Sequence, residues 1–582
     1  MKRIKLEAAR KRLNETKPLY VVGWSGGHHD AAVAIVRYEG ENVTLVAAEH
    51  MERWTGVKND KQLDAVVATR MLSKIPNDSD VLFVAHQKFW GVGGSWAHRT
   101  ETIAAHQVNV KVLEVALREQ ELRHHDWKLR VVGQTAVSHH ESHAWAAWGT
   151  SNKTNAIVLV NDALGETESM TVWFPDSRGG IKKYDKGTIK YPHSLGLFYS
   201  AWTGYLGLTP NEHEYKVMAM ATDVVSGSKR YEDTVSIIAS LTQLEREALE
   251  LNWHRGVSYA LNSKAKSDWK KVLDALELSE LDEGEKRHVL AGVVQRIYQN
   301  LLSDAVEGAF NYNGAKAGTT FLLSGGCALN CSANHHIEQY MNELYGSGSV
   351  GMEAFSNPGD AGSSLGAALA FGQKRLSHQY DPLIGQQVMT LMSARFDGGN
   401  ESSTSDLVAS VVAELKKNGV VAVFTGGNEF GPRALGNRSI LALPSVPKDR
   451  LDAMKGRESW QPFGCVVLDR HTPLFFEVDV PFHSPYMNRV VHWRQSLIED
   501  KKWRAIQHTD GTARVQTVSS SAREGEWQGT PYLVGVLEQM MNDGIDPILV
   551  NTSLNAKGSP MSVSEAEAIE VAKSMNIKLV VG

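Results

Sequence analysis

The sequence predicts an α/β protein built from two parts, and three features of its N-terminal half indicate the fold. Leu19–Gly23 is a short apolar strand, and Ala31–Val36 is a second strand that follows it after a turn. The turn, Gly26–Asp30, combines glycines with polar tips; a strand, a glycine turn and a strand are typical of an actin-like phosphate loop. Ala156–Val160 and Thr320–Ser324 are buried-strand candidates that also run into polar or glycine-rich turns. We therefore expect strands that end in polar or glycine-rich turns in the N-terminal half, with a hairpin like that of an actin-like phosphate loop at its start.

Helical patterns and one polar stretch complete the expected organisation. Residues 63–130 are expected to be mostly helical, and residues 241–309 to form long amphipathic helices. The polar stretch 374–404 predicts a boundary between a first domain, 1–385, and a second domain, 400–582. Further strand candidates in the second domain lie at 419–424, 465–468 and 547–550.

Length and composition bound the class of protein. The chain of 582 residues has room for several domains of about 100–200 residues each. A net charge of −5 gives no global attraction to nucleic acid or anionic membrane, although a local basic groove remains open. The cysteines, Cys327, Cys331 and Cys465, form no CxxC pair, which fits a reducing cytoplasm. Without a signal peptide or an apolar run near the roughly 20 residues of a membrane span, we expect a soluble cytoplasmic protein.

Two histidines and two aspartates predict a metal site. His139 and His143 are four residues apart, so on a helix both imidazoles share one face and can reach one ion. Asp162 follows a predicted strand, and Asp360 lies in a glycine-rich turn. Two His and two Asp suit an octahedral ion such as Fe(II) with open positions for substrate. The alternative is that the two histidines cap or pack their own helix.

A glycine-rich segment of the C-terminal half predicts an anion site. Glu429–Ser439 reads EFGPRALGNRS and follows the apolar run Val420–Phe424. Arg433 and Arg438 lie among glycines, a proline and small residues, which allow unusual backbone conformations. The planar guanidinium of arginine carries several hydrogen-bond donors that suit a carboxylate or a phosphate. The alternative is an ordinary strand, turn and helix with solvated arginines.

Short polar motifs farther along the chain predict nucleotide or phosphate contacts. Lys455-Gly-Arg457 precedes Trp460–Phe463, His508–Gln516 follows, and Val550–Asn555 leaves the last strong strand. Lys and Arg supply charge for phosphates, while Ser and Asn supply short hydrogen bonds. Because the sequence has no GxxxxGK[ST] motif, a nucleotide would bind on another scaffold. Taken singly, a K-x-R motif is usually solvated surface.

In this order the motifs resemble those of the O-carbamoyltransferases of antibiotic biosynthesis and nodulation. The resemblance spans nearly the whole chain, and GPRALGNRS followed by NTSxN is its most specific part. The matching N-terminal segments are Gly26–Asp30, Glu49–Arg53 with Lys58, His139–His143, Asp162 with Gly165-Glu166, Ser194–Gly196, Glu214–Met218, Gly325–Asn330 and Asn357–Gly362.

The resemblance implies a fold and a reaction. The N-terminal half would be a duplicated actin-like domain similar to the metal-binding, threonylcarbamoyl-transferring component of tRNA modification. The C-terminal half would be a YrdC-like α/β domain that forms carbamoyl-adenylate from carbamoyl phosphate and ATP with Mg. The N-terminal half would then use bound Fe(II), or another divalent ion, to pass the carbamoyl group to a hydroxyl acceptor.

The resemblance also implies roles for individual residues. His29, whose reference pKa of about 6.5 suits proton transfer, would lie nearest the acceptor hydroxyl, and Asp30 would assist it. The metal ligands would be His139, His143, Asp162 and Asp360. ATP and carbamoyl phosphate would bind Arg433, Arg438, Lys455, Arg457, His508, Asp510, Arg514, Ser553 and Asn555. Carbamoyl-adenylate or the acceptor would bind Lys58, Gly325, Gly326 and Asn330.

Two positions depart from the family pattern. The turn Gly427–Glu429 lacks the arginine that the family usually has there, and Gln461 stands where the family usually has another arginine. Two positive groups are therefore absent, and Arg433, Arg438 and Arg514 would have to compensate for them in phosphate binding.

The acceptor is left open by the sequence, as is the oligomeric state. We expect a small molecule, but a hydroxymethylated pyrimidine in a nucleotide or nucleic acid is an alternative, because Lys88–Arg99 interleaves aromatic and basic residues. Arg118, Arg123, His124 and His125 lie nearby. This segment could instead be a helical insert with surface aromatics. A non-catalytic actin-like nucleotide sensor and threonylcarbamoyl transfer to tRNA are less consistent with the intact motifs.

Overall fold

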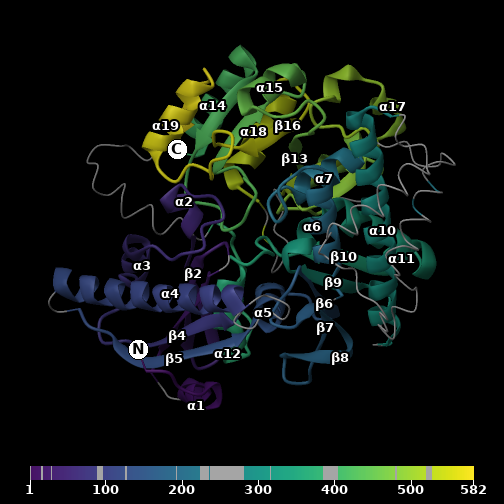
Figure 1. Ribbon diagram of the computed structural model, residues 1–582. Coiled ribbons are helices and arrows are strands. Elements are labelled where there is room, and N and C mark those ends of the chain that lie inside the picture. Colours follow the sequence, from purple (N-terminus) through teal and green to yellow (C-terminus); the bar gives the residue numbers. More distant parts are fainter. Residues whose placement is uncertain are drawn as a thin grey trace.

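The protein folds into three mixed β-sheets with helices between and around them (Figure 1). The computed structural model describes residues 2–582 with gaps at 15–16, 28, 88–95, 125–126, 192, 223–231, 233–234, 236–280, 313, 315, 384–403, 479–481, 520–526 and 528. In this part of the chain no helix is long and apolar enough to cross a membrane.

The first sheet has five strands in the order β3-β2-β1-β4-β5. β1 pairs antiparallel with β2 and parallel with β4, so the predicted hairpin is present beside the centre of the sheet. The strands are β1 Leu19–Ser25, β2 Ala32–Glu39, β3 Asn42–His50, β4 Asp80–Gln87 and β5 Arg130–Ser138.

The second sheet repeats this arrangement. Its order is β10-β9-β6-β7-β8, and β6 pairs antiparallel with β7 and parallel with β9, as β1 does with its neighbours. The strands are β6 Ala156–Asn161, β7 Glu168–Pro175, β8 Ile181–Lys190, β9 Thr319–Ser324 and β10 Val350–Ala354. This repeat confirms the duplication expected of the N-terminal half and is consistent with an actin-like fold.

Two helices, α5 His139–Thr150 and α12 Ser363–Gly372, pack between the two sheets. They approach closely because small residues face each other: a Cβ on Gly366 would lie 1.8 Å from the carbonyl oxygen of Ser142. A Cβ on Gly23 of β1 would likewise lie 2.1 Å from the Ser364 carbonyl oxygen. This close packing fixes α5 and the turn before α12 relative to each other.

The remaining N-terminal helices are short or cover the outer faces. α1 Leu6–Arg10 and α2 Met51–Thr55 are short. α3 Ala65–Leu72 and α4 Trp96–Arg123 pack on the first sheet. The second sheet is covered by α6 Leu195–Tyr205, α7 Glu214–Ala221, α10 Glu283–Tyr312 and α11 Cys331–Tyr345.

The C-terminal part is built on a seven-stranded sheet, which Figure 1 draws in green and yellow. Its order is β14-β15-β13-β16-β12-β11-β17. The strands are β11 Val420–Phe424, β12 Arg438–Ala442, β13 Gly464–Leu468, β14 Arg489–His492, β15 Thr512–Val518, β16 Ile548–Ser553 and β17 Leu579–Val581. The helices around it are α14 Thr404–Asn418, α15 Lys448–Lys455, α16 Thr472–Phe475, α17 Gln495–Ile498, α18 Pro531–Asn542 and α19 Glu565–Ser574.

The predicted strands are confirmed. Residues 63–130 contain helices α3 and α4, as expected, but also one strand that the sequence did not predict: Asp80–Gln87 forms β4, whose Val81–Val84 side chains are buried in the first sheet. Of the predicted helices at 241–309, the described part begins with α10; residues 241–280 lie outside the described residues. The predicted domain boundary also falls on undescribed residues, 384–403. The described cysteines form no disulfide.

Candidate functional site

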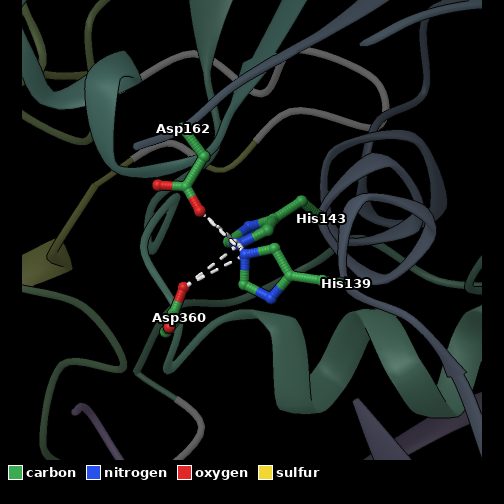
Figure 2. Close-up of side chains that lie close together, drawn as sticks. All are labelled: His139, His143, Asp162 and Asp360. Atoms are coloured by element: carbon green, nitrogen blue, oxygen red, sulfur yellow. Dashed lines mark hydrogen bonds and ion pairs between the residues drawn. The ribbon is translucent and has the colours of Figure 1, made fainter. Parts of the chain in front are cut away.

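Four side chains converge in the N-terminal half at the predicted metal site (Figure 2). His139 Nε2 lies 2.7 Å from Asp162 Oδ2 and 3.2 Å from His143 Nε2. His143 Nε2 lies 3.3 Å from Asp360 Oδ1. All four side chains are buried, with at most 6% of any residue exposed. The fold therefore brings together four residues that the sequence analysis predicted as one site, although His139 and Asp360 are more than 200 residues apart in the chain.

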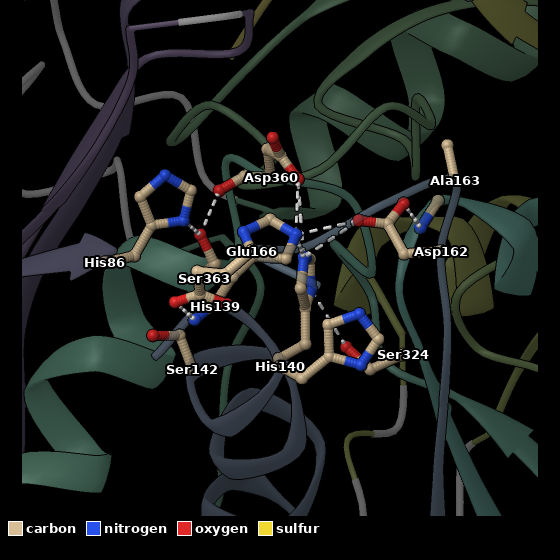
Figure 3. A network of polar contacts seen from close by, with 12 residues as sticks. His86, His139, His140, Ser142, Asp162, Ala163, Glu166, Ser324, Asp360 and Ser363 are labelled. Atoms are coloured by element: carbon tan, nitrogen blue, oxygen red, sulfur yellow. Dashed lines mark hydrogen bonds and ion pairs between the residues drawn. The ribbon is translucent and has the colours of Figure 1, made fainter. Parts of the chain in front are cut away.

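Helix α5 aims both histidines at the aspartates. Ser138 caps the helix by accepting a hydrogen bond from Glu141 N, so the helix starts at His139 and places His143 one turn later on the same face. The Glu166 carboxylate accepts from His139 N at 3.0 Å, which fixes the first turn (Figure 3).

Two turns present the aspartates. Asp162 follows β6, and the amide of Gly326 donates to its Oδ1 at 3.3 Å. Gly325 makes this approach feasible, since it has φ +88° and a Cβ there would meet Asn161 O at 2.3 Å. Asp360 lies in the turn before α12, where Ser363 Oγ bonds to its carbonyl oxygen and contacts His86 Nδ1 at 2.7 Å (Figure 3).

The four-residue cluster fits a divalent cation. One ligand atom from each residue lies within 4.8 Å of the others, and imidazole nitrogens with carboxylate oxygens suit first-row transition ions such as Fe(II). Burying two carboxylates side by side is unfavourable unless a cation or a proton neutralises them. The donor set and its burial thus support a metal centre and leave the choice of ion open.

His29 lies between this cluster and the first sheet. Its Nδ1 contacts Asp30 Oδ2 at 2.8 Å, and its Nε2 lies 3.5 Å from Asp360 Oδ2. The side chain of His29 is 42% exposed, so the ring is reachable from the cavity that it lines. Asp30 therefore orients the ring of His29 beside the metal cluster.

One cavity of about 550 Å³ joins the two halves of the molecule. From the N-terminal half it is lined by predicted residues His29, Asp30, Lys58, Asp162, Gly326, Asn330 and Asp360. From the C-terminal half it is lined by predicted residues Arg433, Lys455, Arg457, His508, Arg514, Ser553 and Asn555.

The C-terminal wall of the cavity is cationic. Arg433, Arg457 and Arg514 lie near one another, and no ion pair to a carboxylate is found for them within the described chain. Burial and the neighbouring Arg514 lower the pKa of Arg433 to about 9 and that of Arg457 to about 10. Cations that repel one another in a partly buried wall are well placed to bind an anion.

The K-x-R and S-x-N motifs meet in this wall. Lys455 Nζ donates to the carbonyl oxygens of Ser553 and Asn555 and to Asn555 Oδ1, each at 2.7 Å. Ser553 Oγ also bonds to Asn555 Oδ1, at 2.6 Å. Burial, with a smaller contribution from Arg457, lowers the pKa of Lys455 to about 7. The lysine is thus a buried, hydrogen-bonded donor at the edge of the cavity.

Comparison with known proteins identifies the family. A family profile described as "Carbamoyltransferase N-terminus" matches residues 95–369, and one described as "Carbamoyltransferase C-terminus" matches residues 412–582. Nodulation protein NolO of Bradyrhizobium diazoefficiens is 31% identical over 459 residues, which cover 74% of this chain and 75% of that protein. The chain belongs to the carbamoyltransferase family.

Two further relatives extend the match. Nodulation protein NolNO of Sinorhizobium fredii is 29% identical over 564 residues, which cover 93% of the present chain and 76% of NolNO. The 3'-hydroxymethylcephem-O-carbamoyltransferase of Streptomyces clavuligerus is 33% identical over 41% of this chain and 43% of its own length.

Five predicted site residues of the carbamoyltransferase do not line the cavity: His139 and His143, which are fully buried in the four-residue cluster, and Arg438, Asp510 and Gly325. Arg438 is fully buried, and its guanidinium donates to the carbonyl oxygens of Thr425, Gly426 and Asn437, so it holds the glycine-rich turn together. Asp510 is exposed and accepts from Thr512 N within its own turn. Gly325 lies behind the wall and acts through its backbone shape.

Sequence reasoning missed several residues that do line the cavity. Tyr215 and Lys216 come from α7, and Lys216 Nζ pairs with Glu458 of the C-terminal half at 3.0 Å. Glu52 and Arg53 come from α2, and Arg53 Nη2 donates to the carbonyl oxygen of Gly431 at 2.6 Å. The motif matches at Glu214–Met218 and Glu49–Arg53 were the available signal, but they gave no role for these side chains.

The segment that motivated a nucleic-acid acceptor is largely undescribed. Lys88–Ser95 and His125 lie outside the described residues, and for 96–99 only the backbone of α4 is described. Arg118, Arg123 and His124 are exposed, and Arg123 pairs with Glu119 one turn away on α4. Arg118, Arg123 and His124 do not line the cavity, so a nucleic-acid acceptor gains no support from the described residues.

Proposed function

We propose that this carbamoyltransferase is ATP-dependent and transfers the carbamoyl group of carbamoyl phosphate to a hydroxyl of a small molecule through carbamoyl-adenylate. The proposal divides the chain into a transferring domain, 1–385, and a YrdC-like adenylate-forming domain, 400–582. It rests above all on one observation: a single cavity is lined on one side by Asp162 and Asp360 of the four-residue cluster and on the other by arginines that form no ion pair with a described carboxylate.

The first half-reaction belongs to the cationic wall. Arg433, Arg457 and Arg514 bind the phosphates of ATP with Mg²⁺ and of carbamoyl phosphate, because their charges have no carboxylate partner among the described residues. Water releases phosphate from carbamoyl phosphate to leave carbamate. A carbamate oxygen then bonds to the α-phosphorus of ATP, and pyrophosphate leaves.

The second half-reaction belongs to the opposite wall. His29 takes the proton of the acceptor hydroxyl, and Asp30 holds its ring in position through Nδ1. The hydroxyl oxygen bonds to the carbamoyl carbon, and the bond from that carbon to the phosphate oxygen breaks, which gives the O-carbamoylated acceptor and AMP.

The buried cluster of His139, His143, Asp162 and Asp360 would hold a divalent ion, which we propose to be iron. Bound there, the ion supplies electrostatic stabilisation to oxygen atoms that gain negative charge during transfer. All four residues are buried, and Asp162 and Asp360 also line the cavity from which a substrate would approach.

One of the two departures from the family pattern, Gln461, fits this arrangement. Gln461 lines the cavity and is buried, and its Nε2 makes no hydrogen bond to the described residues. A neutral amide donor is thus available where the family usually has a cation. Arg433 and Arg514 supply the positive charge in the same wall.

Isotope exchange between ATP and pyrophosphate tests the proposal. The purified protein should incorporate labelled pyrophosphate into ATP only when carbamoyl phosphate is present. When small hydroxylated compounds are then added, a product heavier by one carbamoyl group should form, as measured by mass spectrometry. Exchange that does not depend on carbamoyl phosphate would contradict the adenylate route, even if carbamoyl transfer were observed.

A further inference from the structure

A second group of metal-ligating side chains lies on the other side of His29. His50 Nε2 is 3.4 Å from Asp30 Oδ1, and His50 Nδ1 is 3.8 Å from Glu52 Oε1. Asp30 comes from the turn after β1, His50 ends β3, and Glu52 lies in the first turn of α2. These three residues, which we call the His50 cluster, offer ligand atoms that all lie within 4.8 Å of one another.

The imidazole of His50 is buried without a hydrogen bond. Only 7% of the residue is exposed, and neither ring nitrogen has a hydrogen-bond partner among the described residues. Leaving a buried polar atom without a partner is unfavourable by about 1–3 kcal/mol, so such a group calls for a specific explanation. His50 and its two carboxylate neighbours line the large cavity, which provides a path for a ligand from solvent.

The spacing of the His50 cluster is that of ligands around an ion. Ligands about 2.1 Å from a tetrahedral ion are separated from one another by about 3.4 Å. The 3.4 Å from His50 to Asp30 and the 3.8 Å from His50 to Glu52 are close to this value and long for hydrogen bonds. In the four-residue cluster the corresponding separations between His143 and its two aspartates are 3.3 and 3.8 Å.

The local charge also favours a cation. Asp30 and Glu52 place two carboxylates beside the imidazole of His50. Arg53 Nη1 lies 3.6 Å from Glu52 Oε1 and opposes a cation, but two carboxylates face this single guanidinium.

We propose that Asp30, His50 and Glu52 bind a second divalent cation, of the borderline class represented by Zn²⁺. One imidazole and two carboxylates are ligands that such an ion accepts in a site left open toward the cavity. Asp30 then serves two groups, since its Oδ2 holds His29 and its Oδ1 faces the ion. The second cation site and the four-residue cluster lie on opposite sides of His29.

Counting bound Zn²⁺ tests this site without any assay of catalysis, so the result does not depend on whether the proposed function is correct. Full-length protein is stripped of bound metal with a chelator, equilibrated with excess Zn²⁺, freed of unbound ion and analysed by elemental mass spectrometry. Wild type should hold two ions per chain. Glu52→Gln and His50→Ala should each hold one, and so should His143→Ala, because that variant loses the other site. Combining His50→Ala with His143→Ala should remove both ions.

Two controls keep the result decisive. Glu41→Gln changes the same residue type at an exposed turn of the same sheet and should leave two ions bound. Circular dichroism separates a lost site from a lost fold, and either of the two His50-cluster variants is sufficient if the other fails to fold. A wild type that holds a single ion, or folded Glu52→Gln and His50→Ala proteins that both keep two, would overturn the proposal.

Discussion

Lys455 is the residue whose environment differs most clearly from that of a surface lysine. Its ammonium group is buried among backbone and amide oxygens, and Arg457 is close by. Burial removes hydration from the charged form, so the pKa of Lys455 falls from 10.5 to about 7. The lysine therefore changes its charge near neutral pH, within the wall that we propose to bind phosphates.

We expect anion binding to be coupled to proton uptake at Lys455. A bound phosphate raises the pKa of the lysine, so a protein that is mostly neutral at this position at pH 8 should take up about one proton. Below the pH of the shifted pKa the lysine is already charged, and the uptake should disappear. Calorimetric titration of carbamoyl phosphate in buffers of different ionisation enthalpy measures it. Lys455→Met should abolish the uptake, and an unchanged uptake in this variant would assign it to another group.

His143 provides the residue-scale prediction for the four-residue cluster. As isolated, the protein should carry about one metal ion per chain at this cluster, and in most molecules that ion should be iron. His143→Ala should lose the ion, because the remaining three ligands no longer enclose it. Elemental analysis of both proteins measures the difference. His124→Ala, on the exposed end of α4, is the matched control and should keep its iron. Full iron occupancy in His143→Ala would contradict the ligand assignment.

The sequence predicted some residues of the site better than others, for physical reasons. The i, i+4 spacing of His139 and His143 is local, so a helix is enough to bring them together. Arg438 could not be predicted in the same way, because an arginine in a glycine-rich turn looks the same whether it binds a phosphate or its own backbone carbonyls. The cluster of His50 was missed because its members come from three different elements.

At the scale of elements, the packing of α5 against α12 determines the relative positions of the ligands in the four-residue cluster. α5 carries both histidines, and α12 begins just after Asp360. Their close approach depends on Gly366, where a Cβ would lie 1.8 Å from the carbonyl oxygen of Ser142. Because this neighbour is backbone, it cannot move aside without a shift of the whole helix.

Gly366→Ala should therefore separate the two helices. We expect a loss of about 1–3 kcal/mol in the free energy of unfolding and a lower metal content, because Asp360 moves away from His143. Denaturant unfolding and elemental analysis measure the two effects. Gly284→Ala, near the exposed start of α10, is the control and should be neutral or slightly stabilising, since alanine has the higher helix propensity. Equal behaviour of the two variants would show that the helix contact does not position the ligands.

The elements themselves were predictable to the extent that their signals were local. The apolar runs that became β1, β6, β9 and β11 were recognised because they are short, buried and followed by turns. The strand β4 was missed, since its apolar core stands within a stretch rich in helix-forming residues and its neighbours β1 and β5 are distant in sequence. Strand order in the sheets depends on such long-range pairing, which periodicity does not reveal.

At the scale of the whole molecule, the two halves share one cavity and several direct contacts. Arg53 of α2 donates to the carbonyl oxygen of Gly431, and Lys216 of α7 pairs with Glu458. A Cβ on Gly431 would lie 2.6 Å from the carbonyl oxygen of Ser356, in the loop that leads to Asp360. The glycine-rich turn of the C-terminal half thus packs directly on the loop that carries Asp360, and the shared cavity would give the proposed intermediate a route between the two walls.

We propose that the two walls of this cavity carry two separable half-reactions. Arg457 contributes a partly buried cation to one wall, and removing a charge-assisted hydrogen bond of this kind is expected to weaken binding by roughly 1.5–3 kcal/mol, with a larger effect in the transition state. His139 belongs to the buried cluster behind the other wall.

The most direct test measures carbamoyl-phosphate-dependent ATP–pyrophosphate exchange, carbamoyl transfer and metal content in Arg457→Ala and His139→Ala. We predict that Arg457→Ala loses exchange and transfer but keeps its metal, because no proposed ligand lies in the C-terminal half. His139→Ala should keep exchange but lose the metal and transfer. If His139→Ala abolished exchange as completely as Arg457→Ala, the cavity would be one composite site, and the assignment of one half-reaction to each wall would be wrong.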